Sequence, residues 1–100
     1  MFRLRKTRRI EAAHHLPLHD GKCRGHHGHS YAITVEVEGA ELDHSGPKTG
    51  LLMDYYDIGV IMKEHVESLD HKDLNGIFPY PSSELIAKAL FEKMAPEFRE

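Results

Sequence analysis

The feature that most restricts the fold of this chain is a pair of segments in which apolar and polar residues alternate with a period of two. Such alternation is typical of β-strands with one buried face. The first segment spans roughly residues 2–14 and the second residues 31–37, and histidines at 27 and 29 continue the apolar parity of the second. The inward set comprises Phe2, Leu4, Ile10, Ala12 and His14 in one segment and Tyr31, Ile33, Val35 and Val37 in the other.

The same parity predicts a cluster of histidines. Because His14 closes the first strand and His29 opens the second, antiparallel pairing places His14, His27 and His29 at one end of the sheet, with residues 15–28 as the loop between them. Three imidazoles with one open position are typical of a working zinc or a similar transition metal. Cys23 leaves two alternatives: a free thiol beside the metal, or the fourth ligand of a closed structural site.

Two amphipathic helices are predicted after the strands. Asp54 is a favourable N-cap for the first, whose apolar stripe runs to Leu69, and the second begins at Ser82 or Ser83 and ends by Pro96. The inward residues at helical spacing are Ile58, Ile61, Met62, His65, Val66 and Leu69, then Leu85, Ile86, Ala89, Leu90 and Met94. The fold class is therefore α+β.

Two predicted strands and two predicted helices make an incomplete layer. A two-stranded sheet is marginal, and both of its outer edges would be unpaired. We expect the strands to pair with other subunits, or further strands to follow the C-terminal end of the given sequence, or both.

Length and composition restrict the class of protein. One hundred residues predict one small domain spanning residues 1–100. No apolar run approaches the roughly 20 residues of a transmembrane helix, and the basic N-terminus lacks the apolar stretch of a signal peptide, so we expect no membrane partner. The single cysteine fits a reducing compartment, and the expected location is cytoplasmic.

Basic residues are concentrated in residues 1–24. They indicate either a polyanionic ligand or, as the simpler interpretation, the solvent face and guarded edge of a strand. A nucleic-acid partner is not expected, because no aromatic interleaving or nucleic-acid-binding motif accompanies the charges.

Four motifs, in order, resemble the 6-pyruvoyl-tetrahydropterin synthase and 6-carboxytetrahydropterin synthase family. They are Ala12-Ala13-His14-His15-Leu16-Pro17, the run from Cys23 to His29, Leu69-Asp70-His71-Lys72-Asp73-Leu74-Asn75, and Pro81-Ser82-Ser83-Glu84. The resemblance implies the tunnelling fold, an antiparallel sheet with two helices on one face. It also implies a homo-oligomer, a trimer or hexamer, with active sites at subunit interfaces.

The resemblance assigns a role to each residue of the predicted centre. It implies that His14, His27 and His29 bind zinc and leave one position open for substrate hydroxyls. Cys23 then looks like the general base that removes a proton from the substrate side chain.

Further roles rest on the same resemblance. Asp70 and His71 look like the partners of the cysteine, with the carboxylate orienting the imidazole, and the resemblance implies that they reach the site from a neighbouring subunit. They could instead cap the end of the first helix. Ser82 and Ser83 lie where the family places hydroxyls near the pterin ring, but as helix caps they are explained without that role.

The cysteine placement resembles most the 6-carboxytetrahydropterin synthases of queuosine biosynthesis. The implied substrate is 7,8-dihydroneopterin triphosphate, with loss of triphosphate and acetaldehyde, and Lys22 and Arg24 are then candidates for binding the triphosphate. The alternatives are a 6-pyruvoyl-tetrahydropterin synthase, which loses triphosphate only, or a non-catalytic, zinc-stabilised assembly domain.

The resemblance also predicts two further strands after the second helix, the last carrying a glutamate that anchors the pterin ring. Neither Glu97 nor Glu100 has the context of that residue. The C-terminal strands are therefore expected to be missing from this chain.

Overall fold

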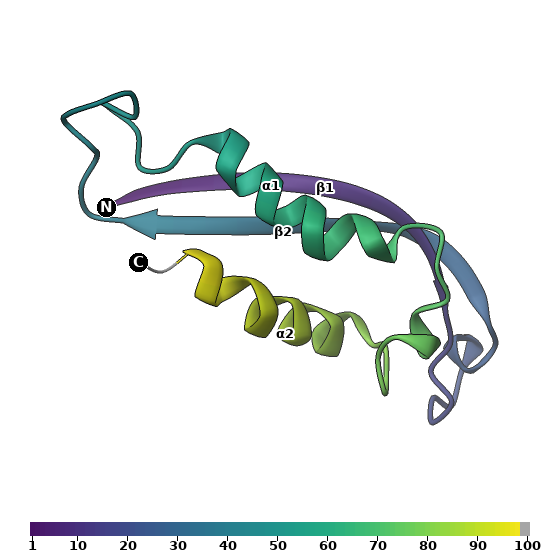
Figure 1. Cartoon of the computed structure of the whole chain (residues 1–100). Coiled ribbons are helices and arrows are strands. Elements are labelled where there is room, and N and C mark those ends of the chain that lie inside the picture. Colours follow the sequence, from purple (N-terminus) through teal and green to yellow (C-terminus); the bar gives the residue numbers. More distant parts are fainter. Residues whose placement is uncertain (99–100) are drawn as a thin grey trace.

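The computed structural model describes residues 1–98, so Glu100 lies outside the described part of the chain. Two strands are followed by two helices, with short 3₁₀ turns at the connections (Figure 1). The strands are β1 (Phe2–His14) and β2 (His27–Gly39), and the helices are α1 (Tyr55–Val66) and α2 (Ser83–Met94). The 3₁₀ turns are η1 (Lys22–Arg24), η2 (Glu67–Leu69), η3 (Leu74–Gly76) and η4 (Ala95–Phe98).

The predicted antiparallel pairing is confirmed. β1 and β2 pair along their whole length, from Phe2 opposite Gly39 to His14 opposite His27. The strand predicted over residues 31–37 is longer than expected, because its pairing with β1 extends to His27 on one side and Gly39 on the other. Figure 1 shows the result as a long curved ribbon whose far end carries the loop between the strands.

The outer face of the ribbon carries complementary cross-strand pairs. Residues of opposite charge, or hydroxyl groups, stand directly across from one another on β1 and β2. These pairs support the simpler interpretation of the alternating basic residues of β1, in which they form the solvent face of a strand. They are Arg3–Glu38 (3.3 Å), Arg5–Glu36 (2.7 Å), Thr7–Thr34 (2.8 Å between hydroxyls) and Ser30–Glu11 (2.7 Å).

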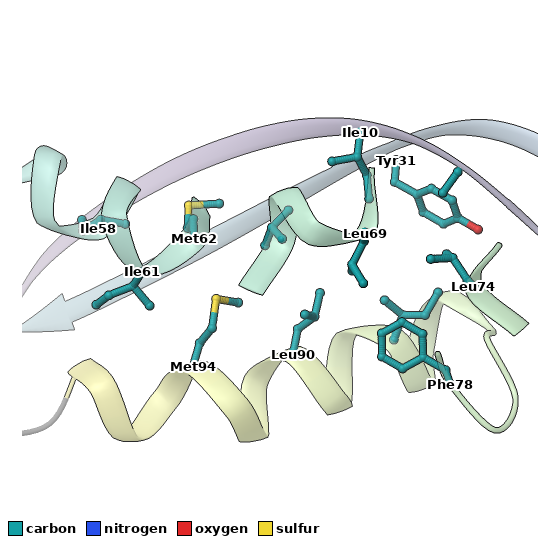
Figure 2. Packing of buried hydrophobic residues seen from close by; sticks show 13 residues of the cluster. Ile10, Tyr31, Ile58, Ile61, Met62, Leu69, Leu74, Phe78, Leu90 and Met94 are labelled. Atoms are coloured by element: carbon teal, nitrogen blue, oxygen red, sulfur yellow. The ribbon is translucent and has the colours of Figure 1, made fainter. Parts of the chain in front are cut away.

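Both helices lie along the inner face of the ribbon (Figure 1). The predicted cap of α1 is present, since the Tyr56 N–H donates to the Asp54 carboxylate at 2.9 Å. α1 packs on β1, and α2 packs on α1, so that side chains of both helices meet those of the strands in one core (Figure 2). The most deeply buried members include Ile58, Met62, Val66 and Leu74. No helix among residues 1–98 is both long and apolar enough to span a bilayer.

A groove lies between β2 and α2. Its volume is about 940 Å³, and its lining includes Ile33 and Val35 of β2 and Leu90 and Phe91 of α2. Phe91 is 64% exposed. The inner face of β2 is therefore less completely covered than that of β1.

Candidate active site

Three histidine side chains converge at the end of the ribbon where β1 ends and β2 begins. His14 and His27 stand directly opposite each other, and His29 is two residues further along the same face of β2. One ring nitrogen from each lies within 4.8 Å of the others, and Nε2 of His14 is 3.0 Å from Nε2 of His29. Only His14 is fully buried, so the cluster has a protected inner side and an accessible outer side.

The other ring nitrogen of each histidine faces a backbone carbonyl. A carbonyl can only accept a hydrogen bond, so each Nδ1 carries a proton, and a ring that is neutral in this tautomer has its Nε2 lone pair free for a metal. This is the arrangement that orients imidazoles as metal ligands. The carbonyls are those of Pro81 (2.7 Å from His14), Gly25 (2.8 Å from His27) and Ser30 (3.1 Å from His29).

The donor set fits a transition metal. The Nε2 atoms of His14 and His29 face each other at 3.0 Å. If both rings are neutral with the proton on Nδ1, these two atoms are both acceptors, and their contact is unfavourable. A cation shared between them would turn the contact into two ligand bonds. Ligands about 2.1 Å from a tetrahedral zinc are roughly 3.4 Å apart, close to the separation seen. Burial lowers the pKa of His14, and so favours the neutral form that binds a metal.

Cys23 lies in η1, within the loop that joins the two strands. Its thiol is not part of the converging ligand cluster, which consists of the three histidines. The side chain is half-buried, and the Leu16 N–H donates to the Cys23 carbonyl at 2.7 Å, which fixes the backbone at this position. Lys22 and Arg24 flank it as exposed residues. With the thiol outside this cluster, the geometry favours a free thiol over a closed four-ligand site.

The Asp70 and His71 side chains form a pair. Asp70 Oδ2 is 3.1 Å from His71 Nδ1, and Asp70 Oδ1 accepts from the Glu11 N–H at 2.8 Å. That backbone hydrogen bond is the main cause of the lowered pKa of Asp70, and the contact with His71 adds to it. The carboxylate thus orients the imidazole and also joins the segment after η2 to β1.

His71 has an unusual backbone conformation. Its φ is 59°, the left-handed region that favours glycine, yet its N–H bonds the Glu11 carbonyl at 2.5 Å. The side chain is 78% exposed. His71 and His29 both line an open depression of about 420 Å³, together with Ala13, Gly28 and Lys72. His71 of the predicted pair and His29 of the cluster therefore face the same hollow.

Ser82 and Ser83 begin α2. The Leu85 N–H donates to the Ser82 hydroxyl at 3.2 Å, so Ser82 is the N-cap, while Ser83 is the first helical residue and is exposed. The contact between this motif and the histidine cluster lies one residue earlier, where the carbonyl of the buried Pro81 accepts from His14. Sequence reasoning missed it, because a backbone carbonyl has no residue signature.

The capping role of Ser82 has a measurable consequence. We expect Ser82→Ala to lower the free energy of unfolding by about 1 kcal/mol, because the N–H at the start of α2 loses its acceptor. Urea denaturation of the variant beside the parent protein measures the difference. An unchanged unfolding midpoint would contradict the cap.

Sequence comparison identifies the family. Residues 3–100 match the sequence profile described as 6-pyruvoyl tetrahydropterin synthase. The chain belongs to the 6-pyruvoyl tetrahydropterin synthase family. The family resemblance predicted from sequence is therefore confirmed, and this family is one of pterin synthases.

Individual members of the 6-pyruvoyl tetrahydropterin synthase family give the same result. The 6-carboxy-5,6,7,8-tetrahydropterin synthase of Synechocystis sp. is 39% identical over 101 residues, covering 94% of this chain and 75% of the relative. The 6-pyruvoyl tetrahydrobiopterin synthase of Homo sapiens is 41% identical over 63 residues, covering 60% of this chain and 41% of the relative.

A solved structure supports the fold. The 6-pyruvoyl tetrahydropterin synthase of Caenorhabditis elegans superposes with a TM-score of 0.77 at 27% identity, covering 93% of this chain and 76% of that one. The tunnelling fold predicted from the resemblance is thus confirmed. This chain spans about three quarters of that structure.

Proposed function

We propose that this chain is a zinc-dependent lyase subunit of the 6-carboxytetrahydropterin synthase type. Its substrate would be 7,8-dihydroneopterin triphosphate, converted to 6-carboxytetrahydropterin with loss of triphosphate and acetaldehyde, in the cytoplasm. The observation that carries the proposal is the cluster of His14, His27 and His29, with each Nδ1 facing a carbonyl and one ring nitrogen of each residue within 4.8 Å of the others. The name of the Synechocystis relative favours this reaction.

The residues of the chain divide the chemistry between them. His14, His27 and His29 would hold zinc, which supplies a Lewis acid that acidifies substrate hydroxyls and polarises a carbonyl. Cys23 would take a proton from the substrate side chain as general base. His71, oriented by Asp70 at 3.1 Å, would pass protons at its ring nitrogens. Lys22 and Arg24 would bind the triphosphate, and Ser82 and Ser83 would contact the pterin.

A second reaction deserves a direct test. The human relative is named 6-pyruvoyl tetrahydrobiopterin synthase, and the corresponding reaction would release triphosphate without acetaldehyde. Incubating the zinc-loaded protein with 7,8-dihydroneopterin triphosphate and assaying acetaldehyde and the pterin product by mass spectrometry separates the two. A zinc-bound protein that releases neither triphosphate nor acetaldehyde would support a non-catalytic assembly domain.

We also propose that the chain works as a homo-oligomer, a trimer or hexamer. The open groove beside β2 and the exposed Phe91 support this, since an uncovered apolar face favours association. Light scattering coupled to size-exclusion chromatography measures the assembly. A monomer at micromolar concentration would contradict it.

The Asp70–His71 pair provides a kinetic prediction. We expect Asp70→Asn and His71→Ala each to lower turnover by about 10²-fold or more, because a positioned proton carrier acts on the chemical step. Zinc content should stay unchanged, since neither residue belongs to the histidine cluster. Steady-state kinetics and metal analysis on the same samples check both parts. Variants that unfold without a specific loss of turnover would assign the pair a purely structural role.

A further inference from the structure

The segment carrying Asp70 and His71 runs beside the free edge of β1 as a short parallel partner. The His71 N–H donates to the Glu11 carbonyl at 2.5 Å, and the Ala13 N–H donates to the Lys72 carbonyl at 3.0 Å. Ala13 and Asp73 form a parallel bridge. Backbone groups of alternate β1 residues are thus hydrogen-bonded to this segment, as in the pairing of two β-strands.

The next position of this ladder is completed by a side chain. The Asn75 Oδ1 accepts from the His15 N–H at 2.8 Å, and the Asn75 Nδ2 donates to the His15 carbonyl at 3.0 Å. The carboxamide of Asn75 therefore makes the two hydrogen bonds to the His15 backbone that a neighbouring strand would make if it continued to this position. Among side chains of this shape only an amide both donates and accepts, so an aspartate would meet the His15 carbonyl with a second acceptor.

Asn75 is itself held in place. Its N–H donates to Asp73 Oδ1 at 3.1 Å, and the same carboxylate oxygen is 3.3 Å from Nε2 of His26. The His26 ring packs against that of His15 with 4.8 Å between centroids. The loop between β1 and β2 is thus tied at both of its ends to the segment 73–75.

Three parts of the proposed active site depend on this contact. His15 follows the cluster residue His14 directly, and the next residue, Leu16, donates the 2.7 Å hydrogen bond to the Cys23 carbonyl. The segment bound at His15 is the continuation of the one that carries Asp70 and His71. Sites that must hold several groups in register lose function when their supporting contacts loosen.

We propose that Asn75 is a positioning residue that holds His14, the Cys23 loop and the Asp70–His71 segment in fixed relation. This inference rests on the proposed function for the roles of those groups, but the contact itself does not. Asn75 lies outside the group of converging ligand atoms, and its side chain is hydrogen-bonded to His15, through which it acts.

The test compares Asn75→Asp and Asn75→Ala with the parent protein. The first measurement is the alkylation rate of Cys23 by iodoacetamide in metal-free protein, at a pH high enough to ionise the thiol. We expect both variants to react at least about threefold faster, because the loop that carries the half-buried thiol is released. The second measurement is zinc affinity and the absorption spectrum of the cobalt-substituted protein. We expect about a 10-fold loss of affinity and an altered spectrum, as for other outer-shell contacts.

Asp54→Ala is the matched control. It removes another side-chain contact to backbone, the cap of α1, at a site distant in the fold from the histidine cluster. It should leave the alkylation rate and the cobalt spectrum unchanged while lowering stability. If both Asn75 variants behave like Asp54→Ala, the inference is overturned. A parent protein that binds no zinc would overturn the proposed function, yet the alkylation rates would still decide the role of Asn75. Should Asn75→Ala fail to fold, the near-isosteric Asn75→Asp retains the acceptor for the His15 N–H and decides the question.

Discussion

Replacing His27 by alanine should reduce bound zinc from about one ion per chain to none after dialysis. His27 supplies one of three converging nitrogens, and the two that remain cannot hold the metal in a tetrahedral site. The loss of affinity should exceed the roughly 10- to 100-fold cost of losing an outer-shell partner. Inductively coupled plasma mass spectrometry of the dialysed protein measures it.

His44→Ala is the control for this experiment, because His44 lies in an exposed loop outside the cluster. It should bind as much zinc as the parent protein. Full zinc occupancy in His27→Ala would show that the three-histidine assignment is wrong.

Replacing Cys23 by alanine should reduce turnover by about 10²- to 10⁴-fold, the usual contribution of a general base. Zinc content should not change, because the thiol lies outside the group of converging ligand atoms. Triphosphate release from 7,8-dihydroneopterin triphosphate and metal analysis on the same preparation measure the two quantities. The two readouts together separate a catalytic thiol from a structural one.

Loss of zinc in Cys23→Ala would indicate a closed site with sulfur as the fourth ligand. The function would then be that of a metal-stabilised assembly domain. Cys23→Ser adds a useful comparison, since a hydroxyl has nearly the same size but a much higher pKa, and should restore little activity.

The parts of the fold predicted from sequence are those with a local signature. The period of two identified both strands, and their parity brought His14 and His27 to the same end of the sheet. The side-chain caps at Asp54 and Ser82 were also predicted correctly from the sequence. These predictions succeeded because each depends on residues close together in the chain.

The contacts that sequence reasoning missed join distant segments through groups without a signature. Pro81 reaches His14 across 67 positions through its carbonyl, and Asn75 reaches His15 across 60 positions by imitating a peptide group. Asp70 was recognised as a partner of His71, but its bond to the Glu11 N–H was not. Backbone groups are present at every residue, so their use becomes visible only in three dimensions.

The cross-strand pairs on the outer face of the ribbon have a consequence for accuracy of folding. A shift of one residue between β1 and β2 would turn His14 away from His27, and a shift of two would leave the histidines on one face but misaligned. Exposed ion pairs such as Arg3–Glu38 and Arg5–Glu36 add little stability, but any shift disrupts them. The ion pairs therefore disfavour wrong pairing of β1 and β2 at one end of the two-stranded ribbon. The three histidines, whose geometry depends on correct pairing, lie at the other end.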